Sequence, residues 1–244
     1  DVMAWLKITA TAMNDLAAIL KDQTDHCNLD AIALIYGSCI SVRDLTSSCA
    51  VLIDKGAPQH ALILARTAYE TGARIAWASQ TTDGWARFQK TRSRAVLTFL
   101  RQVSKCAEWL VPDDLLQDYE SRAQATGHIE DMPRSLEQVL QTIGSLLSTH
   151  RESNVGQTWY DVCVRSMHFY AHGDLNCVAL PPPTNLGLGV SLQLATATAF
   201  LCIAAQRTVG GDSIDIVDKQ IGELWHLMRT YLQGASHSSR STCG

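Results

Sequence analysis

Apolar residues recur along this chain at intervals of three and four positions, which is the spacing of one face of an α-helix. Within residues 2–20, for example, Trp5, Ala12 and Leu16 fall on the same face. No stretch of the sequence alternates apolar and polar residues between hairpin turns in the way that marks a half-buried strand. The spacing therefore predicts an all-α protein.

Glycine, proline and capping residues divide this helical pattern into segments. Gly56 and Pro58, for instance, punctuate the end of one expected helix and the start of the next. Since no linker or internal repeat separates two parts, we expect one domain of about eight to nine helices over residues 1–233. The Ser-rich residues 234–244 are expected to form a disordered tail. The expected helices cover residues 2–20, 29–54, 58–79, 84–110, a shorter segment after Pro112, 135–148, 155–172, 190–209 and 213–233.

Composition limits the classes of function. With 46% hydrophobic and 18% charged residues, the chain can bury a sizeable core. Its net charge of −4 gives no overall basic character, so a nucleic-acid-binding role would depend on a local patch. Uninterrupted apolar runs stay below the roughly 18–20 residues of a membrane span. Ser191 and Gln193 break the most apolar stretch, residues 190–205, so we expect a buried core helix there and no membrane partner.

The eight cysteines are not arranged as a disulfide framework or a C-x-x-C metal motif. Half of them lie inside apolar helical runs, where free cysteine behaves as a small hydrophobe. This placement predicts a reducing, cytoplasmic setting. The four are Cys39, Cys49, Cys163 and Cys202.

The third expected helix combines an apolar surface with three regularly spaced charges. Apolar residues surround it almost completely, which is typical of a central, buried helix. Arg66, Glu70 and Arg74 nevertheless stand at positions i, i+4 and i+8. Charges in a buried helix must be paired, because an unpaired one costs several kcal/mol. The three residues form either an internal ion-pair ladder or the lining of a pocket, and the sequence leaves both open.

The seventh expected helix carries a narrow polar stripe. Asp161, Arg165, His168 and His172 fall within about 60° of one another on a helical wheel. The rest of the circumference is apolar or aromatic. A solvated helix face would be wider and would carry more lysine and glutamate, so the stripe is the chain's leading candidate site.

Several chemistries fit this stripe. It is a structural network in which Asp161 pairs with Arg165, or it is a metal-free ribonuclease site with His172 as general acid or base. It is otherwise a site for a divalent metal, with His168 and His172 at i, i+4 and a carboxylate from Glu70 or Asp174.

A fourth interpretation is a small-molecule enzyme or ligand-binding protein, and a fifth is a non-enzymatic interaction scaffold. The small-molecule pocket would lie between the third and seventh helices. Its walls would be aromatic, with Trp77, Tyr160, Phe169 and Tyr170 contributing.

Residues 61–77 resemble a known pattern. The Arg66-x-x-x-Glu70 pair, followed by Arg74 and Trp77, is similar to the signature helix of the DUF5677-type bacterial proteins. That group resembles the wider HEPN superfamily of helical bundles. The resemblance follows the layout of residues 29–205, but individual residues match in two helices only.

The second matching helix carries the element that marks HEPN nucleases, an arginine followed after four to six residues by a histidine. Arg165 and His172 have this pattern, with six residues between them. The resemblance implies a metal-independent ribonuclease of a bacterial defence or toxin-type system, working as a homodimer without a cofactor. It further implies that His172 transfers protons and Arg165 stabilises phosphate charge. Asp161 would orient Arg165, and Arg66 and Glu70 would support the site.

Overall fold

The computed structural model confirms the all-α class. It describes residues 2–23, 28–105, 111–125, 128–147 and 186–210, and single positions at 156, 157, 160, 164, 215, 217, 219, 220, 222, 223 and 226. Within these residues there are seven complete helices and no strand. They are α1 (Val2–Lys21), α2 (Leu29–Asp54), α3 (Pro58–Gln80), α4 (Gly84–Val103), α5 (Asp113–Ala125), α6 (Leu136–Leu147) and α10 (Leu186–Val209).

Seven is fewer than the eight to nine helices that the sequence predicts. The helices expected over residues 155–172 and 213–233 fall mostly outside the described residues, as does the expected tail. The expected helix 84–110 was wrong in its end, because α4 stops at Val103. There the Lys105 N–H donates to the Gln102 carbonyl at 3.2 Å and tightens the last turn. The chain then returns alongside α4 as α5, where the Arg101 guanidinium meets the Glu120 carboxylate at 2.7 Å.

The boundary between α2 and α3 follows from local chemistry. Gly56 has a φ of 73°, the left-handed conformation that glycine adopts without steric cost. The Gly56 and Ala57 N–H groups donate back to the carbonyls of Ile53 and Leu52, at 3.0 and 2.8 Å. Pro58 then opens α3 at a position where its missing N–H leaves no helical hydrogen bond unmade.

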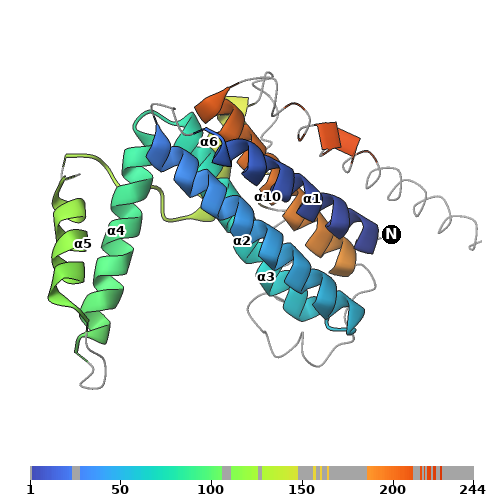
Figure 1. Ribbon diagram of the computed structural model, residues 1–244, viewed down its shortest axis with the longest axis horizontal. Coiled ribbons are helices and arrows are strands. Elements are labelled where there is room, and N and C mark those ends of the chain that lie inside the picture. The colour runs from blue at the N-terminus through green and yellow to red at the C-terminus, as the bar shows by residue number, and fades with distance from the viewer. Residues whose placement is uncertain are drawn as a thin grey trace, which may run out of the picture.

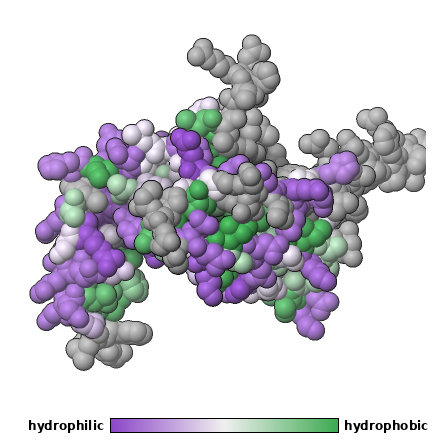
Figure 2. All heavy atoms as spheres, turned by 45° about the horizontal axis from the view of Figure 1, so that its top comes forward, coloured by the Kyte–Doolittle hydropathy of each residue, from purple (hydrophilic) through white to green (hydrophobic). Residues whose placement is uncertain are grey.

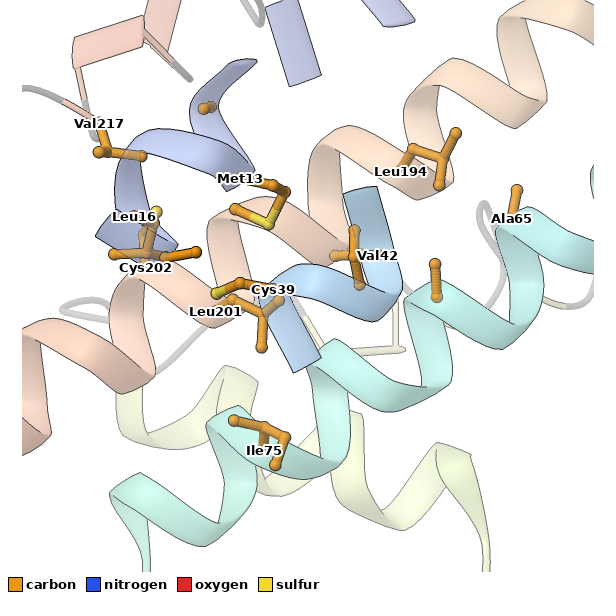
Figure 3. Packing of buried hydrophobic residues seen from close by; sticks show 14 of the residues in the cluster. Met13, Leu16, Cys39, Val42, Ala65, Ile75, Leu194, Leu201, Cys202 and Val217 are labelled. Atoms are coloured by element: carbon orange, nitrogen blue, oxygen red, sulfur yellow. The ribbon is translucent and has the colours of Figure 1, made fainter. Parts of the chain in front are cut away.

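The centre of the bundle is the crossing of α3 and α10. An ideal Cβ on Gly72 of α3 would lie 2.7 Å from the Ala197 carbonyl oxygen of α10, so this glycine permits the two backbones to approach closely. Helix α2 packs against both α3 and α10, and α1 packs against α2 and α10 (Figure 1). Side chains from all four helices form the main core cluster; Figure 3 shows Met13, Cys39, Ala65 and Leu201 among its members.

A second core cluster joins α3, α6 and α10. Tyr69 and Phe200 contact through their rings, with centroids 5.8 Å apart. Trp77 of α3 and Ile143 of α6 belong to the same cluster and are almost completely buried. The predicted site residues of α3 lie next to the face of that helix that this cluster buries.

Helix α10 is long and apolar enough to cross a membrane by length and composition. In the structure, 78% of its most apolar window is buried inside the protein, which is the burial of a core helix. This agrees with the core helix that the sequence predicts there, although α10 begins at Leu186, four residues before the expected start.

Candidate functional site

The predicted polar stripe lies outside the described residues. This applies to Asp161, Arg165, His168 and His172, and equally to Phe169, Tyr170 and Asp174. Four positions of the same segment are described, at 156, 157, 160 and 164. The Val164 N–H donates to the Tyr160 carbonyl at 2.9 Å, which is the i to i+4 hydrogen bond of an α-helix.

These four positions show what the segment packs against. Val164 is 2% exposed and belongs to the cluster with Tyr69 and Trp77 of α3, and the partly buried Tyr160 packs against that cluster. Earlier in the segment, Gln157 accepts a hydrogen bond from the Gln141 amide of α6 at 2.9 Å. At its described positions, the segment that carries the stripe therefore joins the core cluster of α3, α6 and α10 and is hydrogen-bonded to α6.

Two of the charged residues of α3 pair with each other. Arg66 and Glu70 form an ion pair, with Arg66 Nε 3.0 Å from Glu70 Oε1. Their side chains are 19% and 34% exposed, so the pair is partly open to solvent. On a helical wheel both residues flank Trp77, which belongs to the same core cluster as Val164.

Arg74, the third charge of the expected ladder, reaches towards a different part of the chain. Its guanidinium donates to the Arg134 carbonyl at 3.3 Å and lies 3.9 Å from the Met132 sulfur. Arg74 thus ties α3 to the segment that leads into α6. The structure brings Arg66 and Glu70 together as a pair and separates Arg74 from them.

Trp77 is a core residue with a cation above its ring. It is 1% exposed, and the Arg87 guanidinium carbon lies 5.0 Å from its ring centre. Such a cation–π contact contributes roughly 0.5–2 kcal/mol. Tyr160 is only partly buried, so of these two predicted pocket residues Tyr160 alone offers surface to a ligand.

The structure reveals a groove that was not predicted from the sequence. Two cavities, of about 690 and 430 Å³, share Ala33, Leu34 and Arg92 and so form one continuous groove. We call it the arginine groove. Helices α2, α4 and α5 line its larger part, and α2, α3 and α4 line its smaller part. Arginines contribute to its wall from three helices, namely Arg74, Arg92 and Arg122.

Helix α4 is the source of much of the positive charge near this groove. It contains five basic residues and no acidic residue, in a chain whose net charge is −4. Hydrophilic side chains cover much of the surface at the α4–α5 end of the molecule (Figure 2). This run of bases was the sequence signal that could have indicated the groove. The five residues are Arg87, Lys90, Arg92, Arg94 and Arg101.

Four of these five bases are paired within the protein. Asp131 contacts both Lys90 and Arg94, at 3.8 and 2.8 Å. Lys90, nearly fully buried, also donates to the Ile129 carbonyl, and Arg87 pairs with Glu130 at 3.4 Å. Arg101 pairs with Glu120 of α5.

Arg92, the fifth base, is the exception. It is exposed and has no ion pair or hydrogen bond with any residue that the structure describes.

Arg122 and Tyr119 complete the wall on α5. The Asp118 carboxylate accepts a hydrogen bond from Arg122 Nε at 3.0 Å and raises the pKa of the guanidinium, which stays fully charged. The Arg122 guanidinium carbon lies 5.5 Å from the Tyr119 ring centre. The groove therefore combines an ion-paired guanidinium with an aromatic ring.

The metal interpretation of the stripe depends on residues that the structure describes only in part. Within the described ranges, no three His, Cys, Asp or Glu side chains stand close enough to hold a metal ion. Glu70, the described member of that ligand set, is paired with Arg66. The other members are His168, His172 and Asp174, which lie outside the described residues.

No family model, curated protein or solved structure matches this chain. The resemblance to the HEPN superfamily therefore rests on residues of the sequence, chiefly Arg66, Glu70 and the Arg165-x6-His172 spacing.

Proposed function

We propose that this protein binds and cleaves RNA without a metal ion, as a HEPN-like homodimer in a bacterial defence or toxin-type system. The reaction is transfer of the RNA phosphodiester to its own neighbouring 2′-hydroxyl. The catalytic group is His172, and Arg165 stabilises the negative charge that develops on the phosphate oxygens. Asp161 orients Arg165, and His168 lies in the same stripe.

One observation carries the proposal. Val164, from the segment that contains the stripe, is buried in the core cluster that also holds Tyr69 and Trp77 of α3. Trp77 lies between Arg66 and Glu70 on the helical wheel of α3. Both sequence segments that resemble one family therefore contribute a residue to the same core cluster, which supports a shared site. The part-exposed Arg66–Glu70 pair supplies charge on the same helix.

The proposed chemistry balances without a cofactor. A proton leaves the 2′-hydroxyl for the neutral imidazole of His172 as the 2′-oxygen bonds to phosphorus. The bond from phosphorus to the 5′-oxygen then breaks, and that oxygen takes the proton from the His172 imidazolium, which returns to its neutral form. The products are one RNA end with a 2′,3′-cyclic phosphate and one with a 5′-hydroxyl. The Arg165 guanidinium suits this role, because its planar N–H groups match two phosphate oxygens.

The test is cleavage of a labelled single-stranded RNA in the presence of EDTA. We expect the unaltered protein to cut, and His172→Ala and Arg165→Ala to be slower by at least about 100-fold, the usual loss for a general acid–base group. His60→Ala is the matched control, because His60 is an exposed histidine at the start of α3. It should cut at the rate of the unaltered protein.

Two results would overturn the proposal. One is equal cutting by the unaltered protein and His172→Ala, which would identify a contaminant nuclease. The other is an absence of cutting under all conditions by protein whose circular dichroism shows a folded helical chain. Cutting that EDTA abolishes would favour the metal site with His168, His172 and Glu70 or Asp174 instead.

A further inference from the structure

We propose that the arginine groove binds the sugar–phosphate backbone of single-stranded RNA, with Arg92 as its central contact. The choice of RNA rests on the function proposed above. The binding of a phosphate-bearing ligand rests on the groove alone. The described residues that line the groove come from α2, α3, α4 and α5.

The first reason is charge. Among the described residues that line the groove, the ionisable groups are three arginines, one carboxylate and the phenol of Tyr119. The carboxylate is Asp30, near the start of α2, and the arginines come from α3, α4 and α5. Asp118 pairs with Arg122, so among the described residues three guanidiniums face two carboxylates, Asp30 and Asp118, and positive charge is in excess. This excess lies at one concave place on a chain that is acidic as a whole. A polyanion that this chain binds would be expected to bind there.

The second reason is the state of Arg92. The other four bases of α4 are each held by a carboxylate of the same chain, on α5 or on residues 130–131. Arg92 has no such carboxylate in the described part of the chain, although Asp131 engages Arg94 only two positions away. Its guanidinium lines both cavities, where its N–H groups are available to bind two oxygens of one phosphate.

The third reason is the shape and chemistry of the wall. The larger cavity alone, about 690 Å³, is within the roughly 300–1,000 Å³ of a site for one small ligand, and the smaller cavity extends it. A run of nucleotides fits such an extended groove. Tyr119 offers a ring for base stacking beside Arg122, and Gln89 and Ser93 offer polar groups. On α2, an added Cβ at Gly37 would meet no atom within 4 Å, so there is room for the ligand.

The test measures binding to a fluorescein-labelled oligouridine of twelve nucleotides by anisotropy. The protein carries His172→Ala, so that RNA is not consumed. In this background Arg92→Glu should raise Kd by at least about tenfold, and Arg92→Gln should raise it less. The slope of log Kd against log salt should fall by about one for the lost phosphate contact. Arg101→Gln is the control on the same helix outside the groove, and it should change Kd by less than about twofold.

Two further arms identify the ligand. Uridine monophosphate should compete only weakly if several nucleotides fill the groove. Poly-glutamate of similar charge should compete weakly if the sugar and bases contribute. Equal competition by poly-glutamate would overturn the assignment to RNA, and strong competition by the mononucleotide would overturn the assignment to a run of nucleotides.

The outcomes separate this inference from the proposed function. RNA binding that depends on Arg92 in a protein that never cuts RNA supports the groove and refutes the nuclease. Cutting and binding at unaltered rates and affinities in Arg92→Glu support the nuclease and overturn the groove. Circular dichroism and thermal melting establish that Arg92→Glu is folded, which is expected because the residue is exposed.

Discussion

The α3–α10 crossing and the α4–α5 hairpin are built from different interactions. In α10, 15 of 24 residues are buried, and a glycine of α3 permits close backbone contact. In α5, none of the 13 residues is buried, and its described side-chain contacts to α4 include the Arg101–Glu120 ion pair. Burial of apolar area stabilises the first region. Ion pairs connect the helices of the second region, and exposed ion pairs contribute little to the free energy of folding.

This difference indicates that the helix crossing stabilises the fold and that the hairpin offers groups for binding. A densely packed crossing tolerates few changes and positions other elements, such as the segment at Tyr160 and Val164. A charged hairpin adds little stability but offers groups that bind ligands, Arg92 above all. Substitutions in the two regions should therefore differ in the free energy of unfolding by several-fold.

The largest effect is expected at the helix crossing. Gly72→Ala places a Cβ about 2.7 Å from the Ala197 carbonyl oxygen, so the backbones must separate. We expect the free energy of unfolding to fall by about 2–3 kcal/mol, as measured by urea denaturation. The matched control is Gly37→Ala in α2, where a Cβ meets no atom within 4 Å. It should raise stability by about 0.5–1 kcal/mol through helix propensity. A change of the free energy of unfolding in the same direction for both variants would refute the close approach of the α3 and α10 backbones.

The next effect concerns the buried amine of α4. Asp131→Asn removes the carboxylate 3.8 Å from Lys90, whose side chain is only 5% exposed. An inadequately paired charge then remains in the protein, and we expect a loss of about 1–2 kcal/mol in chemical denaturation. Adding Lys90→Met should recover part of this loss, because the buried charge is gone. A double variant that is less stable than Asp131→Asn would contradict this explanation.

A third effect depends on pH. Burial raises the pKa of the Cys39 and Cys49 thiols from 9.0 to about 12. The unfolded chain loses these protons above pH 9 while the folded chain keeps them, so stability falls as pH rises from 9 towards 12. Each thiol should contribute a loss of about 1 kcal/mol between pH 9 and pH 10. Urea denaturation at the two pH values should show a smaller loss of unfolding free energy for Cys39→Ala than for the unaltered protein. An identical loss in both proteins would show that the Cys39 thiol is accessible to solvent.

The smallest effect is expected within the hairpin. Glu120→Gln removes the partner of Arg101, and the two side chains are 41% and 58% exposed. Thermal melting should reveal a loss of no more than about 0.5 kcal/mol, since water screens such pairs. A loss as large as that of Gly72→Ala would mean that ion pairs hold the hairpin as strongly as packing holds the core.

Local interactions explain why several features could be predicted from the sequence. The bounds of α2 matched the expectation, because Asn28 caps its start and Gly56 follows its end. The pairing of Arg66 with Glu70 follows from i, i+4 spacing, which any helix brings together. Contacts across the sequence could not be inferred in this way. Arg74 has its acceptor on Arg134, 60 residues away, so its departure from the ladder depends on the path of another segment.

By itself, then, the sequence determined the helical class and most helix boundaries, because each depends on residues within a few turns. The stripe at Asp161, Arg165, His168 and His172 stays a prediction, because these residues lie outside the described ranges. Only the tertiary structure decided that α4 ends at Val103 and that Val164 joins the core cluster of α3, α6 and α10. It alone assembled the arginine groove. The groove's walls come from helices that are neighbours only after folding, and an arginine becomes available to a ligand only when folding leaves it without a carboxylate.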